Sequence, residues 1–147
     1  PGQFPQVGGL RFEYDPARRA QVLDAGRNVT TAGERVRRVV LIDAAGNDVE
    51  TLVDNGALVV PASRRFRLVT LGLLATGGEG YPLSRYAARP DASVVSLDST
   101  AGNQGYLDAG REQRALADYL GATYPRGGAS YSASDTPAAL DRRIRRL

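Results

Sequence analysis

The clearest strand signal of the chain lies in the stretch Gly2-Gln3-Phe4-Pro5-Gln6-Val7-Gly8-Gly9-Leu10-Arg11-Phe12-Glu13-Tyr14-Asp15. Within it, apolar residues at positions 10, 12 and 14 alternate with the charged Arg11 and Glu13. A period of two is typical of a strand with one face buried, so we expect a strand within residues 4–14. The pair Gly8-Gly9 predicts a bend or bulge before the alternation, and Asp15-Pro16 ends it. The stretch therefore predicts a sheet that packs one face against a core.

Further strands are expected on the C-terminal side of this stretch. The β-branched run Val36–Ile42 leads into a turn signal at 44–47, and Val49–Val53 reads as the returning strand of a hairpin. An apolar stretch at 57–60 leads past a proline into Phe66–Leu71, whose alternation again favours a strand. The polar residues 17–33 between them have no convincing period, although Pro16–Leu23 is compatible with a short helix.

The C-terminal third of the sequence contains one strong helix signal. A helix that begins near Asp108 or Gly110 places Leu116, Tyr119 and Leu120 on one face. Residues 122–134 are rich in Gly, Ser, Pro and Tyr and predict a loop, and the arginine-rich tail 135–147 is expected to be helical or loose. The fold class predicted is α+β, with mixed, mainly antiparallel sheets and outer helices. No linker is apparent, so we expect one domain over residues 1–147 with long loops.

Composition excludes many kinds of chemistry. The chain of 147 residues has no Cys and no His, which excludes a thiol nucleophile, a disulfide, an imidazole base and the usual zinc sites. No segment has the acidic spacing of a calcium loop, so no metal site is predicted. All 19 basic residues are Arg and are interleaved with 16 acidic ones, which argues against a nucleic-acid partner. No apolar run approaches the roughly 18 residues of a membrane span. The chain begins with Pro1 and lacks Met, which predicts a piece of a longer product.

A glycine-rich segment, Thr76-Gly77-Gly78-Glu79-Gly80-Tyr81, is the best candidate for ligand contact. Glycine allows backbone amides to approach a ligand closely, and loops carry function more often than cores do. No Lys or Ser follows at the spacing of a phosphate-binding P-loop, so a tight turn is the alternative interpretation. Tyr14 and Tyr81 are interpreted as structural, and Asn28-Val29-Thr30 matches a glycosylation sequon.

Two phrases together resemble the C-terminal domain of the 5'-nucleotidase family. The first is the opening stretch at 2–15, which is similar to the family's G-x-F-x-Q-V-x-G-L-x-x-x-Y-D. The second is Leu73-Leu74-Ala75-Thr76-Gly77-Gly78-Glu79-Gly80-Tyr81, which is similar to N-F-x-A-x-G-G-D-G-Y. The order and spacing of the two phrases agree with the family. The resemblance covers roughly the first 82 residues, and the remainder fits loosely.

The resemblance implies a two-part phosphoester hydrolase of the 5'-nucleotidase or UDP-sugar hydrolase type. Its N-terminal metallophosphatase domain would hold two divalent metal ions, and the C-terminal domain would bind a nucleotide or nucleoside. This chain would then be a substrate-binding domain truncated at its N-terminal side, with no catalytic residue, no cofactor and no activity alone. The family also implies a periplasmic or extracellular setting. The nucleotide-holding arginines of the family lie upstream of the first phrase, so none of the arginines here inherits that role.

The family's site residues carry over to this sequence only in part. In the family two aromatic rings sandwich the base, one from each phrase. Phe4 matches the first ring, Leu73 stands at the second ring's position, and Glu79 stands for the aspartate of G-G-D-G, beside Gly77 and Gly78. A leucine covers a base by apolar contact but forfeits a ring-on-ring contribution of roughly 0.5–1.5 kcal/mol. The predicted substrate-binding residues are therefore Phe4, Leu73, Gly77, Gly78 and Glu79, with half of the clamp altered.

Two alternatives to nucleotide recognition stay open. Leu73 and Glu79 also suit a degenerate structural or interaction domain that has lost its ligand. Alternatively, the parent hydrolase acts on UDP-sugars, cyclic nucleotides or another phosphoester. An activity screen on the full-length parent separates these hypotheses.

Overall fold

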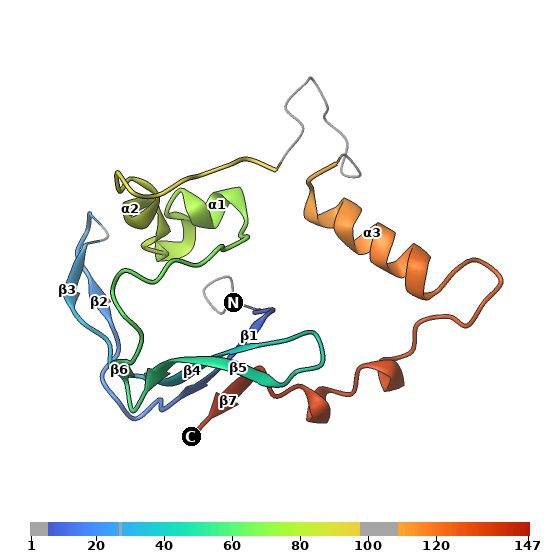
Figure 1. The fold of residues 1–147 in the computed structure, drawn as a ribbon, viewed down its shortest axis with the longest axis horizontal. Coiled ribbons are helices and arrows are strands. Elements are labelled where there is room, and N and C mark those ends of the chain that lie inside the picture. Colours follow the sequence, from blue (N-terminus) through green and yellow to red (C-terminus); the bar gives the residue numbers. More distant parts are fainter. Residues whose placement is uncertain (1–5, 27, 98–108) are drawn as a thin grey trace. The chain divides into compact units, whose positions relative to one another are not determined.

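The computed structural model describes residues 6–26, 28–97 and 109–147, which form the strands and helices drawn in Figure 1. A five-stranded sheet has the order β6-β5-β4-β1-β7 and a two-stranded ribbon pairs β2 with β3. The strands of the larger sheet are β1 Leu10–Tyr14, β4 Val36–Ile42, β5 Asp48–Asp54, β6 Ala57–Leu58 and β7 Ile144–Arg146. The ribbon consists of β2 Val22–Leu23 and β3 Val29–Thr31.

The helices are short except for one. They are α1 Gly72–Ala75, α2 Leu83–Ala87 and α3 Glu112–Thr123, with 3-10 turns η1 Gly78–Gly80, η2 Ala133–Asp135 and η3 Ala138–Leu140. All pairings in the larger sheet are antiparallel except that of β1 with β7, which is parallel. The predicted α+β class, with a mixed, mainly antiparallel sheet, is confirmed.

Two compact units make up the chain. The first contains residues 1–86 together with 141–147, and the second contains residues 87–140. A compact unit is not yet a domain, which needs its own core and the capacity to fold independently. The single domain expected over 1–147 therefore stays a prediction.

The larger sheet has two faces of opposite character, because residues that face each other across an antiparallel pair share a face. One face is apolar. It carries half-buried side chains from four strands: Leu10, Phe12, Tyr14, Val39, Leu41, Val53 and Ile144. The alternation at 10, 12 and 14 thus predicts β1 and its apolar face correctly, although all five residues of β1 are half-buried.

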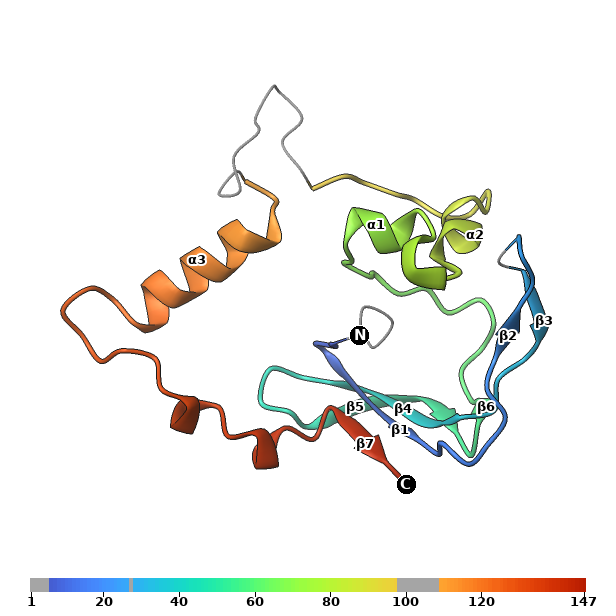
Figure 2. The ribbon, with the colours of Figure 1, turned by 180° about the vertical axis from the view of Figure 1, so that it is seen from behind.

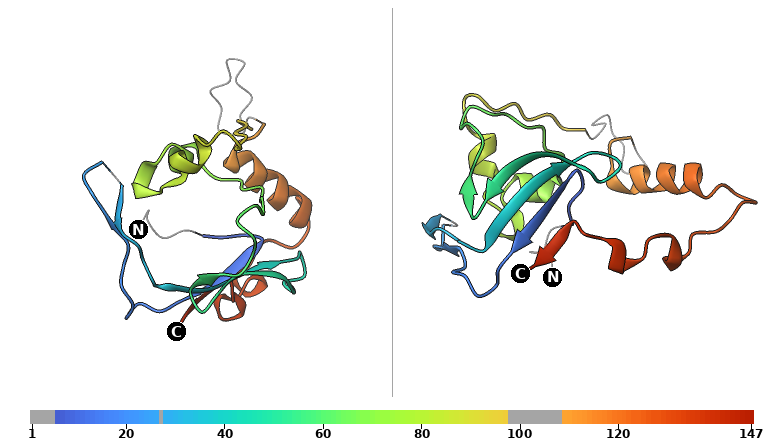
Figure 3. Two further views of the ribbon diagram at one scale, coloured as in Figure 1. Left: turned by 60° about the vertical axis from the view of Figure 1, so that its left-hand side comes forward. Right: turned by 60° about the horizontal axis from the view of Figure 1, so that its bottom comes forward.

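The other face of the sheet carries the charged side chains together with the buried Val40, which is registered with Arg11. Arg145 of β7 forms an ion pair of 3.2 Å with Glu13 of β1, and Asp48 of β5 is paired with both Arg11 and Arg38. These pairs connect four neighbouring strands, which lie side by side in both views of Figure 3. Each pair is partly exposed, so its contribution to stability is modest. Their arrangement is consistent with this strand order, because opposite charges meet between β7 and β1 and between β4 and β5, and Arg11 of β1 reaches Asp48 of β5.

Val40 is the apolar side chain that is fully buried among the described residues. It lies in the middle of β4, which has β1 on one side and β5 on the other. The predicted hairpin of Val36–Ile42 with Val49–Val53 is confirmed, with β5 beginning one residue earlier and ending one later. The sheet is therefore organised around β4.

The end of the chain is a strand, which corrects the expectation of a helical or loose tail. In β7 Ile144 is registered with Phe12, and the backbone amide of Phe12 donates to the carbonyl of Arg143 at 2.7 Å. The Arg143 side chain donates to the carbonyl of Val7 at 2.9 Å and forms an ion pair with Asp141. Figure 2 shows β7 lying beside β1 at the edge of the sheet. The arginines around Ile144 suggested a solvated helix face, but β1 supplies a backbone partner that no local pattern reveals.

Two further expectations are wrong. The short helix expected within Pro16–Leu23 is absent, because the last two residues pair as β2 with β3. Phe66–Leu71 is not the strand that its alternation predicts, because it has no ladder partner among the described residues. Its side chains at 66, 68, 69 and 71 are exposed.

The helix predicted from Leu116, Tyr119 and Leu120 is confirmed as α3, which begins at Glu112 after an extended Arg111. Glu112 lies in the first turn, where a negative charge interacts favourably with the helix dipole. An ion pair at i,i+4 spacing joins Arg114 to Asp118 at 2.8 Å. Local interactions of this kind explain why the helix can be predicted from sequence.

Candidate functional site

The glycine-rich segment forms two turns of helix with a sharp bend between them. α1 ends at Ala75, Gly77 has a φ of 91°, and η1 then contains Glu79 with a φ of 53°. Left-handed backbone of this kind is rare for residues other than Gly, Asn and Asp. Gly77 is also buried, and a Cβ there would lie 3.1 Å from the Ser84 hydroxyl oxygen. The expected tight turn is therefore present, with helical turns where a plain loop was expected.

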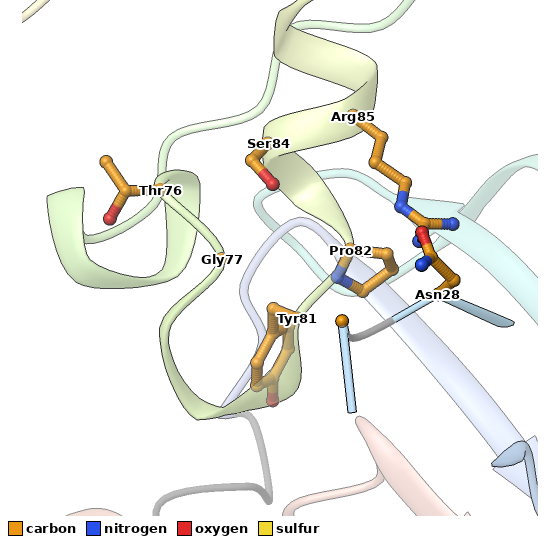
Figure 4. A pocket seen from close by; sticks show the side chains of 8 residues that line it. Asn28, Thr76, Gly77, Tyr81, Pro82, Ser84 and Arg85 are labelled. Atoms are coloured by element: carbon orange, nitrogen blue, oxygen red, sulfur yellow. The ribbon is translucent and has the colours of Figure 1, made fainter. Parts of the chain in front are cut away.

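A pocket of about 310 Å³ opens beside this turn (Figure 4). Its volume is at the low end of the range of roughly 300–1,000 Å³ that ligand sites occupy. Eight residues from the turn, α2 and the tip of the β2–β3 ribbon line it: Gly26, Asn28, Thr76, Gly77, Tyr81, Pro82, Ser84 and Arg85. The pocket thus joins one of the family-like phrases to the polar segment 17–33, for which the sequence has no convincing period.

A direct hydrogen bond connects the ribbon tip to α2. The Arg85 guanidinium donates to the side-chain oxygen of Asn28 at 2.5 Å, across 57 residues of sequence. Figure 4 shows the Arg85 side chain extending from α2 towards Asn28. The contact closes one side of the pocket.

Asn28 is itself held by the turn that carries it. Its backbone amide donates to one oxygen of Asp24 at 2.6 Å, and its side-chain amide donates to the other at 3.0 Å. These hydrogen bonds, the backbone one foremost, lower the pKa of the Asp24 carboxyl below its usual 3.8, so the group is ionised at neutral pH. With the side-chain NH₂ bound to Asp24, the amide oxygen is the atom that faces Arg85.

Two further side chains of the pocket, Thr76 and Ser84, differ in whether their hydroxyl groups are hydrogen-bonded. The Thr76 hydroxyl lies within hydrogen-bond distance of the carbonyls of Gly72 and Leu73, at 3.0 and 3.1 Å, and so stabilises the end of α1. The Ser84 hydroxyl makes no hydrogen bond within the part of the chain that the structure describes. Ser84 is therefore the neutral donor that is available for a ligand.

The structure places the predicted site residues as follows. Gly77 lines the pocket, whereas Leu73, Gly78 and Glu79 belong to the same turn but are not among the lining residues. A Cβ on Gly78 would lie 2.5 Å from the Leu73 side chain, so only glycine allows this packing. Leu73 is 61% exposed, which leaves its outer face open to a ligand. Phe4 lies outside the described residues, and ligand contact by all five residues stays a prediction.

Sequence reasoning missed several residues of the pocket. Asn28 attracts notice only as part of a sequon, Tyr81 is interpreted as structural, and neither Ser84 nor Arg85 belongs to a phrase. Arg85 could have been found from the second phrase, because it lies only four residues beyond its end. The partnership of Arg85 with Asn28 depends on tertiary structure alone.

The comparison with known families agrees with both phrases. A sequence profile of the family described as 5'-nucleotidase, C-terminal domain matches residues 1–85, more than half of the chain. The chain belongs to this family. No curated protein and no solved structure matches the chain. The matched region of this 5'-nucleotidase C-terminal domain contains the whole pocket and every predicted site residue.

The family resemblance assigns two metal ions to an N-terminal domain. The described residues of this 5'-nucleotidase C-terminal domain contain no cluster of ligands for a metal ion. No group of three or more Asp and Glu residues comes together within residues 6–26, 28–97 and 109–147. None of the helices in these ranges is long and apolar enough to cross a membrane.

Proposed function

We propose that this chain is the nucleotide-recognising part of a 5'-nucleotidase-like phosphoester hydrolase, whose metal-binding catalytic domain is contributed by another part of the parent protein. Membership of the family, over a region that contains both phrases, is the observation that carries the proposal. The pocket beside the glycine turn supports it, because it lies next to the residues that resemble the family's base clamp.

In this proposal the chain supplies position and binding energy. Phe4 stacks on one face of the base, Leu73 covers the other, and Glu79 orients a neighbouring polar group. Holding a substrate in a fixed geometry lowers the barrier of a reaction that another domain performs. We further propose that the parent is exported to the periplasm or the cell exterior, and a parent gene without an export signal would contradict this.

A nucleoside titration tests the proposal. We expect adenosine and uridine to shift the amide NMR signals of Leu73 and residues 77–80 saturably, with little difference between the two bases. Stacking is tolerant of base identity, which is the reason for the small difference. The absence of saturable shifts at these residues up to millimolar ligand would contradict nucleoside recognition by this chain.

The Leu73→Phe variant sharpens this test. Restoring the second ring should tighten adenosine binding by about 2- to 13-fold, which corresponds to roughly 0.5–1.5 kcal/mol of aromatic stacking. Leu68→Phe is the matched control, because Leu68 is 64% exposed, compared with 61% for Leu73, but lies outside the turn. Equal tightening by both variants would show nonspecific apolar contact and contradict a specific clamp.

One observation favours a second candidate function, a non-catalytic interaction domain. The segment Phe66–Leu71 exposes four apolar side chains and has no strand partner among the described residues. Exposed apolar patches often mark contacts with another polypeptide. Concentration-dependent self-association that Leu68→Glu abolishes, without any nucleoside binding, is the result that would favour this candidate.

A further inference from the structure

The charge of the residues that line the pocket indicates which chemical class of ligand the pocket binds. Arg85 is the charged side chain among the eight lining residues, and no carboxylate is among them. Asp24 accepts hydrogen bonds from Asn28 and interacts electrostatically with Arg85, but it is not a lining residue. A cation at the wall of a small polar pocket favours an anionic ligand, and the planar guanidinium suits the oxygens of phosphate.

The position of Arg85 is fixed from outside its own helix. α2 is a short helix of five residues. The hydrogen bond to Asn28 constrains the guanidinium of Arg85, and the Asn28 backbone and side-chain amides are held in turn by the two oxygens of Asp24. A pre-positioned arginine loses less conformational freedom when it binds a ligand.

A neutral donor completes the arrangement. Ser84, next to Arg85 in α2, lines the pocket, and its hydroxyl makes no hydrogen bond within the described ranges. The buried Gly77 faces this hydroxyl, and a side chain there would approach its oxygen to 3.1 Å. The absence of a side chain at 77 keeps the space beside Ser84 open.

We propose that this pocket is a subsite for an oxyanion of the phosphate type, in which Arg85 and Ser84 bind the anion and Asn28 positions Arg85. The small volume suits such a group better than a whole drug-sized ligand. The inference rests on the proposed function in one respect, that the phosphate of a nucleotide is the oxyanion expected there. The β2–β3 ribbon is then a wall of the ligand site.

The test compares three probes on the whole chain of 147 residues: inorganic phosphate, adenosine 5'-monophosphate and adenosine. We expect phosphate and the monophosphate to shift the amide signals of Ser84 and the side-chain Nε–H signal of Arg85, and adenosine to leave both unchanged. Phosphate binding should weaken as ionic strength rises. No shift at either residue with phosphate and with the monophosphate overturns the subsite. Adenosine shifts at Leu73 in that same experiment would leave the proposed function standing.

Variants separate binding from positioning. Arg85→Ala should weaken phosphate binding about tenfold or more, since charge-assisted hydrogen bonds are about twice as strong as neutral ones. Asn28→Ala should weaken it about threefold and broaden the Arg85 Nε–H signal, because the preorganising contact is gone. Unchanged phosphate affinity in Arg85→Ala, with an intact amide spectrum, overturns the proposal.

The chain provides a matched control for Asn28. Asn47 occupies the same place in a second turn, where its backbone and side-chain amides donate to the two oxygens of Asp43 at 2.8 and 3.1 Å. It has no arginine partner within the described ranges. Asn47→Ala should therefore leave phosphate affinity and the Arg85 signal unchanged. Equal losses in both asparagine variants would show a general effect on folding and overturn the positioning role.

Discussion

Two hairpins of the molecule have turns of the same chemistry but different surroundings. In the β4–β5 hairpin the carboxylate of Asp43 accepts from both amides of Asn47, and in the β2–β3 ribbon Asp24 does the same with Asn28. The main-chain bond that closes each turn is also alike, with Asp43 donating to Asn47 at 3.0 Å and Asp24 to Asn28 at 2.8 Å.

What differs is the structure behind each turn. β4 and β5 have seven residues each and include the buried Val40, whereas β2 and β3 have two and three residues, and Val22 is 50% exposed. The ribbon is held at its tip by the bond from Arg85 to Asn28. The Asp43–Asn47 turn thus closes a hairpin whose strands are already fixed by packing. The equivalent Asp24–Asn28 turn attaches a weakly packed ribbon to the pocket.

The largest expected effect separates the two hairpins by stability. Val40→Ala should lower the free energy of unfolding by about 1–3 kcal/mol, since it removes buried methyl groups and leaves a cavity. Val22→Ala in the ribbon should change it by less than about 0.5 kcal/mol, as is usual at exposed sites. Urea denaturation followed by circular dichroism measures both. Similar losses for the two variants would mean that the ribbon is as much a part of the core as β4.

A smaller effect is expected from the turn glycines. Gly46 has a φ of 84°, and a Cβ there would meet no other atom. Gly46→Ala should therefore lower the free energy of unfolding by about 1 kcal/mol through backbone strain alone. A Cβ on Gly26 would lie 3.0 Å from the side-chain nitrogen of Asn28. Gly26→Ala should therefore leave global stability nearly unchanged while it displaces Asn28 and shifts the Arg85 Nε–H signal. A shift of that signal in Gly46→Ala would contradict the independence of the two turns.

The smallest expected effect is on titration at low pH. Hydrogen bonds from the paired asparagine lower the pKa of both Asp24 and Asp43 below 3.8. A lowered folded-state pKa stabilises the fold above the unfolded-state pKa, and this contribution is lost as pH falls below 3.8 through the folded value. NMR of the carboxyl carbons should show that both groups titrate below pH 3.8. The Arg85 Nε–H signal should shift over the same pH range as the Asp24 carboxyl. A midpoint at or above 3.8 for Asp24 would mean that its turn is open in solution.

The parts of the fold that sequence predicts are those with a strong local signal. β1, the β4–β5 hairpin and α3 follow from periodicity and turn residues, because each is specified within one short continuous stretch of chain. The segment Phe66–Leu71 shows the limit of this reasoning. Its alternation predicts a strand wrongly, because a strand needs a neighbouring strand as partner and periodicity does not supply one. The same limit hides β7, whose parallel partner is β1.

The candidate site divides in the same way. The family-like phrases locate the glycine turn and Gly77 correctly at the pocket, because the turn is a local structure. Arg85 and Asn28 are 57 residues apart in the sequence, and no local pattern around either residue predicts their hydrogen bond. A helix expected within 16–23 also obscured the ribbon that carries Asn28. Sequence therefore locates the local turn that borders the pocket but not the contact that joins the distant elements Asn28 and Arg85, and ligand binding by the predicted residues stays a prediction.

The pairing of β7 with β1 has a consequence for the order in which the molecule assembles. The side chain of Arg143 reaches the carbonyl of Val7 across 136 residues, one of the largest sequence separations in the chain. Contacts of high sequence separation slow folding, because the entropy of closing a long loop is lost before the contact forms. During synthesis the exposed edge of β1 emerges long before the strand that covers it. We expect that edge to be the last part of the sheet to close and the most open to mispairing with other nascent chains.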